Sequence, residues 1–174
     1  MVTPRNQRNI AVPIIKAVLL LAVLTGGVIW YMVTHSPAAM VRKQLQSAIQ
    51  QVSKPSGEGN AVTAFKLLAF EHLLDEQITC NVRDFPYNGT SSANSFASLV
   101  FRGRSYPESI DLSISAMECE FPRKNQAKVR CLARAVIHMG GRRADESRNC
   151  IILMTKRDRN WLISGVQDDD LLKK

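Results

Sequence analysis

An uncharged apolar run near the amino terminus limits what this 174-residue chain can fold into. Residues 17–34, AVLLLAVLTGGVIWYMVT, contain no charged side chain. As a helix that rises ~1.5 Å per residue, the run would span about 27 Å, close to the thickness of the hydrocarbon core of a membrane. Trp30 and Tyr31 lie near its far end, where aromatic side chains favour the membrane interface. The run therefore predicts one transmembrane helix.

The charges on either side of the run predict its orientation. Arg5, Arg8 and Lys16 precede it and no acidic residue does. Because basic residues favour the cytoplasmic side, we expect residues 1–16 to form a cytoplasmic tail and residues 35–174 an exported domain. A cleaved signal peptide is the alternative, but the run is longer than the usual ~7–15-residue apolar region of such peptides. In a bacterium this layout predicts a single-pass inner-membrane protein with a periplasmic domain.

Composition and charge indicate a folded domain with a mixed surface. Apolar residues make up 45% of the chain and charged residues 22%, which is typical of globular proteins. The net charge is +8, and the Lys and Arg residues after position 35 are scattered without a run of five. This pattern does not predict nucleic-acid binding. We expect the membrane and other envelope proteins as partners, and self-association into a homo-oligomer stays open.

Helical spacing is confined to the first part of the exported domain. Ser36 and Pro37 are typical of a helix start, and the glycine-containing segment KPSGEGN predicts where that helix ends. A second helix is expected from Ala61 to Thr79, where apolar residues cover more than one helical face. The segment SFASLVFRGRSYP fits a short helix or a strand equally well.

From Ser109 onward the apolar period changes to two. Four strands are predicted, linked by short polar turns, at residues 110–121, 128–139, 149–156 and 160–167. The fold class expected after the membrane segment is therefore α+β, with two or three helices packed on a four-stranded antiparallel sheet.

The last predicted hairpin resembles a known family. In KRDRNWLISGV, a charged turn precedes Trp161, one further residue and Ile163, as in the closing hairpin of NTF2-like domains, which form a cystatin-like cone. The order of helices before an antiparallel sheet is also similar. This resemblance implies a cone over residues 37–171, and the apolar periodicity predicts Trp161, Ile163, Phe65 and Phe70 in its core.

The layout of tail, membrane helix and exported domain is similar to that of VirB8-type subunits of secretion and conjugation machines. That resemblance implies a non-enzymatic assembly or scaffold subunit of an envelope complex. Two alternatives stay open: an exported domain that binds an apolar ligand, and an NTF2-like enzyme.

Four cysteines offer candidate disulfides. Cys119 and Cys131 are equally spaced about Asn125, which would place them opposite each other in a hairpin and near disulfide range. Cys80 and Cys150 would then form the second pair, on the evenness of the count alone. Buried free thiols are the alternative.

Candidates for chemistry are few. His138, at the end of the second predicted strand, could act as a general base or lie at the sheet rim, and Asp111 is expected on the face away from the core. His72 lies among acidic residues of the second helix, which indicates a charged helix face more than a metal site. The sequence contains no recognisable catalytic or phosphate-binding motif, and we expect no cofactor and no enzymatic activity.

Overall fold

The computed structural model describes residues 36–83, 85 and 87–169. The chain divides into two compact units, residues 1–40 and 41–174, and the fold below is that of the second unit. The predicted cytoplasmic tail and transmembrane helix, residues 1–16 and 17–34, lie outside the described residues. Of the helices in the described part, none combines the length and the apolar character needed to cross a membrane.

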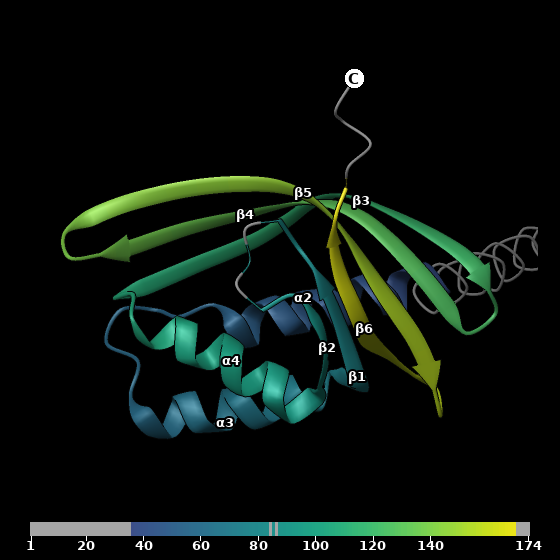
Figure 1. The fold of residues 1–174 in the computed structure, drawn as a ribbon, viewed down its shortest axis with the longest axis horizontal. Helices are drawn as coiled ribbons and strands as arrows, with labels where there is room; N and C mark the ends of the chain where they lie inside the picture. Colours follow the sequence, from purple (N-terminus) through teal and green to yellow (C-terminus); the bar gives the residue numbers. More distant parts are fainter. Residues whose placement is uncertain (1–35, 84, 86, 170–174) are drawn as a thin grey trace, which may run out of the picture. The chain divides into compact units, whose positions relative to one another are not determined.

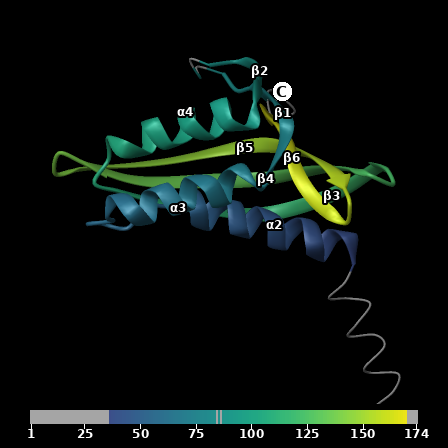
Figure 2. The same cartoon turned by 90° about the horizontal axis from the view of Figure 1, so that it is seen from below.

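Three helices lie on one side of a curved sheet (Figures 1 and 2). They are α2, Pro37–Val52, α3, Asn60–Glu71, and α4, Ala93–Ser105. The start of α2 is the predicted one, and the backbone N–H of Ala39 donates to Ser36 Oγ at 3.2 Å. The ambiguous segment forms α4, whose N-cap Ser92 accepts a hydrogen bond from the N–H of Ser95. This cap favours helix over strand because it satisfies an N–H group that the helix leaves unpaired.

The sheet has six strands and mixed pairing, so the expected four-stranded antiparallel sheet is wrong in both respects. The strands are β1, Leu74–Asn81, β2, Gly89–Ser92, β3, Ser109–Arg123, β4, Gln126–Met139, β5, Arg142–Arg157, and β6, Asn160–Asp168. Their order is β2-β1-β6-β5-β4-β3. Neighbours are antiparallel except β1 and β6, which run parallel.

Strand β1 begins within the helix that the sequence predicted from Ala61 to Thr79, and it takes the last six residues of that range. The helix ends at Glu71, and the alternation of buried Ile78 and Cys80 with exposed neighbours is that of a strand. Gly165 of β6 lets β1 approach closely, because a Cβ there would lie 3.0 Å from the carbonyl oxygen of Thr79. The sequence pattern was misleading because the apolar residues of a helix and of the strand that follows it together resemble one helix with a broad apolar face.

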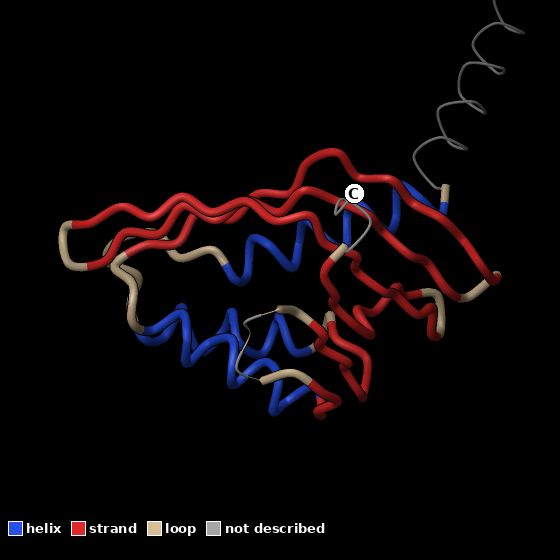
Figure 3. Tube along the Cα trace, turned by 45° about the horizontal axis from the view of Figure 1, so that its top comes forward, coloured by secondary structure: helices blue, strands red, loops and turns tan. Residues whose placement is uncertain are grey.

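The last four strands follow the predicted period, with one extension. Strand β5 begins at Arg142 instead of Asn149, and its first residues are polar and exposed. Gly140 and Gly141 have positive φ and close the tight turn before it, so a segment expected as a loop continues the hairpin. Irregular pairing between Ser115 and Glu118 and between Leu153 and Met154 interrupts the register. Such bulges increase twist and bending, and Figure 3 shows the long strands curving over the helices.

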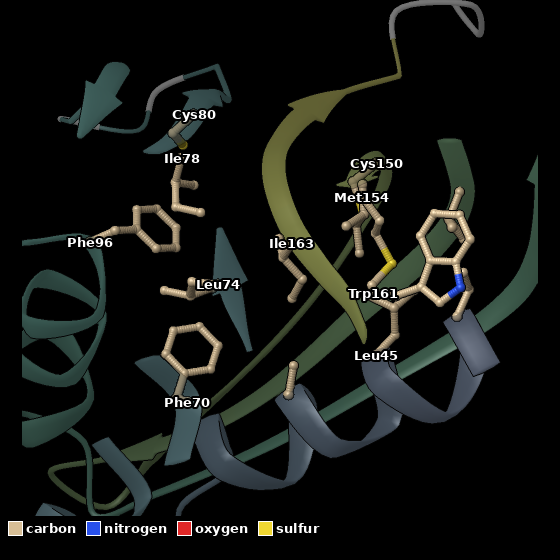
Figure 4. Close-up of a cluster of buried hydrophobic side chains, with 14 of the residues drawn as sticks. Leu45, Phe70, Leu74, Ile78, Cys80, Phe96, Cys150, Met154, Trp161 and Ile163 are labelled. Carbon is tan, nitrogen blue, oxygen red and sulfur yellow. The ribbon is translucent and has the colours of Figure 1, made fainter. Parts of the chain in front are cut away.

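Three of the four predicted core residues are buried. Trp161, Ile163 and Phe70 are 2%, 6% and 5% exposed, and Figure 4 shows them within the apolar cluster. Phe65 is 73% exposed, so its predicted place in the core is wrong. It shares the outer face of α3 with Val62 and Leu68, which are also exposed. The helix is apolar on both sides, but only the side that carries Phe70 packs against the domain.

Neither predicted disulfide is present, and the register of the strands places the cysteines differently. All four thiols are free, and Cys119 lies opposite Val129 because the β3–β4 hairpin turns at Lys124 and Asn125 and has a further shift before Arg123. Cys131 instead lies opposite Cys150, with the two sulfur atoms 3.3 Å apart. Cys80 lies beside Gly89 and Val166, so a Cys80–Cys150 pair is also wrong. The hydrogen bond to Cys150 and burial raise the pKa of the Cys131 thiol.

This register predicts the connectivity under oxidation. Refolding in a glutathione redox buffer should join Cys131 to Cys150, as one thiolate attacks oxidised glutathione and the other then displaces reduced glutathione from the mixed disulfide. Non-reducing mass mapping should find this bond in the wild type and in the Cys119→Ser variant, and lose it in Cys131→Ser. A bond between Cys119 and Cys131 would contradict the observed register.

Candidate functional site: an apolar cavity in the cone

A central cavity of about 520 Å³ lies between the helices and the concave face of the sheet. Of the elements in the described part of the chain, all three helices and every strand except β2 contribute to its wall. The lining residues are Leu45, Ala48, Ile49, Val52, Phe70, Leu74, Cys80, Val82, Phe85, Phe96, Val100, Leu112, Ile114, Ala135, Ile152, Ile163 and Val166. All are apolar apart from the weakly polar thiol of Cys80, so the cavity offers a surface for apolar contact.

The largest core side chain does not fill this cavity. Trp161 packs with Phe121 at a ring-centroid distance of 5.8 Å and lies with Met154 on the other side of β6 from Phe70 and Phe96 (Figure 4). Phe70 is a wall of the cavity, and its ring contacts Phe101 at 6.1 Å. The cone is therefore not packed solid, which leaves room for a ligand.

A second chamber of about 480 Å³ adjoins the central cavity. The two share wall residues Val52, Phe85, Val100, Leu112 and Ala135. The second chamber is also lined by Tyr87, Arg102 and Tyr106, which are exposed. It is thus the more polar of the two spaces, and both are partly open to solvent. A smaller space of about 220 Å³ lies against Leu112 and Ala135 further along the β3–β5 strands.

A buried ionic cluster lies at the wall of the second chamber, to which Arg104 contributes. We call it the Glu58 cluster, and it consists of Glu58, Thr63, Lys66 and Arg104. The Arg104 guanidinium donates to both carboxylate oxygens of Glu58 at 2.6 and 2.8 Å, and each side chain is 2% exposed. Arg104 also donates to the carbonyl oxygens of Val52 and Ser53. The cluster therefore ties α4 to the segment that joins α2 and α3.

Two further side chains complete the Glu58 cluster. Lys66 Nζ donates to Glu58 at 2.8 Å and to the carbonyl oxygen of Ser53 at 2.9 Å, and the Thr63 hydroxyl donates to Glu58 at 3.0 Å. Burial alone would raise the pKa of Glu58, but the hydrogen bonds from Lys66, Arg104 and Thr63 lower this pKa from 4.5 to about 2. The carboxylate is thus charged at any ordinary pH.

The residues nominated from sequence lie away from these cavities. His138 is exposed opposite Ser109 and Arg143, and Asp111 is exposed opposite Val136. Neither lines the central cavity, the second chamber or the smaller space. His72 is exposed at the end of α3, and among the described residues no group of three or more His, Cys, Asp and Glu side chains could hold a metal ion. Sequence reasoning missed Arg102, which only the folded position of α4 brings to a cavity.

Cys80 is the one titratable side chain among the described residues that line the central cavity. Burial raises the pKa of its thiol, so the group is neutral in the folded protein. The described wall thus contributes no charge to the central cavity.

No known family pattern matches the sequence, and no curated protein matches it. Solved structures do match the fold. An NTF2-like protein with a cystatin-like fold from Novosphingobium aromaticivorans is 10% identical, with a TM-score of 0.59 over 97% of this chain and 94% of that one. A hexachlorocyclohexane dehydrochlorinase, LinA-type3 from Novosphingobium barchaimii, is 10% identical, with a TM-score of 0.59 over 76% and 84%. The domain therefore has an NTF2-like fold.

These likenesses correct the expectation that the chain is not an enzyme. The same fold occurs in a dehydrochlorinase, so the fold is compatible with catalysis and the lack of a recognisable motif does not argue against it. At 10% identity the likeness shows the fold alone and assigns no reaction to this chain. The resemblance to secretion subunits finds no counterpart among these structures.

The Glu58 cluster predicts an acid-dependent loss of stability. Because folding lowers the pKa of Glu58 from 4.5 to about 2, the carboxylate stabilises the fold above pH 4.5, and this contribution falls as the pH drops toward 2. Replacing Glu58 with Gln should lower the free energy of unfolding at pH 7 by roughly 3 kcal/mol, since it leaves the buried Arg104 without its counter-charge.

Urea unfolding monitored by circular dichroism at pH 7 and at several points down to pH 2.5 measures both effects. Glu120→Gln is the matched control, because Glu120 pairs with Arg130 at the surface and its side chain is 50% exposed. The control should change stability by less than about 0.5 kcal/mol. Equal losses in the two variants, or an unchanged acid slope in Glu58→Gln, would contradict the assigned role.

Proposed function

We propose that the cone binds an apolar small molecule in its central cavity. The observation that carries this proposal is a cavity of about 520 Å³ whose described wall is apolar. Pockets for small ligands are typically ~300–1,000 Å³ and mostly apolar, so the size and the lining both fit. Transfer of each CH₂ group of a ligand from water into such a wall contributes about 0.8 kcal/mol.

The wall also disfavours a charged ligand group in the central cavity. A charged group placed among Leu112, Ile114 and Ile152 would lose its hydration, and the described wall offers no opposite charge in return. The polar part of any ligand should therefore lie in the second chamber or in solvent.

We also propose that this binding takes place at a membrane, with the domain exported and residues 17–34 as its anchor. The support is the uncharged apolar sequence of those residues and the basic residues before them. Assembly with other envelope proteins, as in secretion subunits of similar layout, stays a prediction from the sequence. Carbonate extraction of membranes that contain the full-length chain tests the anchor, since an anchored chain stays in the pellet.

A cavity-filling variant tests ligand binding. Ala135 lines the central cavity, the second chamber and the smaller space, so Ala135→Trp should occupy the volume that the ligand needs. The neutral fluorescent probe N-phenyl-1-naphthylamine should bind the wild type and bind this variant at least about tenfold more weakly, which corresponds to ~1.4 kcal/mol.

Ala144→Trp is the control, because Ala144 is an exposed residue of β5 that lines none of the three spaces. It adds the same side chain to the same hairpin and should leave the probe affinity unchanged. The proposal fails if the wild type does not bind the probe, or if both variants bind it as the wild type does.

A further inference from the structure

The second chamber contains a positive charge that the fold does not use. Arg102 and Arg104 both lie in the last turn of α4 and both line this chamber. Arg104 is buried and bonded to Glu58 and to two carbonyl oxygens. The Arg102 side chain is exposed and has no hydrogen bond or ion pair with any described residue. Two neighbouring arginines thus differ in their roles, one structural and one unassigned.

Other arginines at the cavities are occupied. Arg134 and Arg148 line the smaller space, where Arg134 pairs with Asp145 and Arg148 donates to the carbonyl oxygen of Arg83. Among the described residues that line the three spaces, Arg102 is therefore the one arginine whose guanidinium lacks a protein partner. An arginine fork is well matched to a carboxylate or a similar oxyanion.

The surroundings of Arg102 also suit an anion. Tyr87 and Tyr106 line the same chamber, and their hydroxyl groups have no hydrogen-bond partner in the described part of the chain. No Asp or Glu is among the described residues that line the central cavity or the second chamber. An anion in this chamber would therefore find one arginine without a protein partner and two tyrosine hydroxyl groups in the described wall, and no carboxylate among the described lining residues.

The position of Arg102 beside the central cavity indicates which kind of ligand could contact both. Val100 lies two residues before Arg102 on α4 and lines both spaces, as do Leu112 and Ala135. A molecule whose apolar body contacts these shared walls can reach the arginine side of the second chamber with its other end. We propose that the ligand is amphipathic, with a carboxylate or similar oxyanion at one end, and that Arg102 binds this anionic group. This proposal rests on the proposed binding of an apolar molecule in the cone.

A pair of ligands that differ in the head group separates the two proposals. Decanoate and 1-decanol have the same chain length, and each can displace N-phenyl-1-naphthylamine from the full-length protein in amphipol, with protein-free amphipol as the blank. At pH 8 the wild type should bind decanoate about tenfold more tightly than decanol, because a hydrogen bond to a charged group stabilises more than one between neutral groups.

Substitutions at Arg102 then assign the preference to this side chain. Arg102→Met should bind decanoate about tenfold more weakly and decanol within twofold of the wild type, whereas Arg102→Lys should retain part of the preference. Arg142→Met is the matched control, because the Arg142 side chain is exposed, its guanidinium has no partner among the described residues, and it lines none of the three spaces. It should bind both ligands as the wild type does.

The remaining outcomes distinguish the anionic head group, the apolar binding and the assignment to Arg102. If the wild type binds both ligands equally, or if Arg102→Met leaves the preference intact, the anionic head group is wrong while apolar binding stands. If neither ligand nor the probe binds the wild type, the proposed function itself fails. Equal losses in Arg102→Met and Arg142→Met would show a general effect of surface charge and would overturn the assignment to Arg102.

Discussion

The buried ion pair between Arg104 and Glu58 is the contact on which the rest of the cone depends. A domain with a large apolar cavity cannot hold its helices by close packing alone, because side chains that face empty space lose their partner atoms. Here Arg104 bonds α4 to Glu58 and to the carbonyl oxygens of Val52 and Ser53. A buried charge is tolerated when it is paired and hydrogen-bonded, and here Arg104 pairs with Glu58 and also donates to two carbonyl oxygens.

The same segment is bonded to the sheet. Lys54 and Ile110 exchange backbone hydrogen bonds of 2.8 and 2.9 Å, and the Leu112 N–H donates to Ser53 Oγ. Val52, Leu112 and Val100 of α4 are also walls of the cavities. The polar contacts thus fix, from outside, the distance between helices and sheet that keeps the cavity open. The strand bulges contribute as well, because they bend the sheet, whose long strands curve over the helices (Figure 3).

Local patterns in the sequence were sufficient where an element is fixed by its own residues. The cap at Ser36 and the period-two strands from Ser109 were found because capping and alternation are local signals. Strand β1 was missed because Leu74 and Ile78 fit a helical stripe as well as a strand, and only its pairing with β2 and β6 in the folded sheet decides between them. Phe65 was wrongly predicted in the core for a related reason, since apolar residues on two sides of a helix do not indicate which side packs against the domain.

The candidate site was less accessible to prediction. Cys131 and Cys150 lie opposite each other because of the register of the β4–β5 hairpin. A slip of one residue in that register would separate them. The cavity depends on the separation of elements that are far apart in the chain, and no periodicity encodes a space that side chains leave unfilled. Arg102 lines the second chamber only because of the folded position of α4, and no local pattern distinguishes it from Arg104, which is bonded to Glu58.

The most direct test of a ligand-binding cone is to locate a bound apolar molecule. Intermolecular NOEs between 1-decanol and methyl-labelled full-length protein can do this, because they report contacts within about 5 Å. A ligand in the cone should give NOEs to the methyl groups of Val100, Leu112 and Ile114. NOEs confined to the exposed α3 residues Val62 and Leu68, with none to the cavity wall, would contradict it.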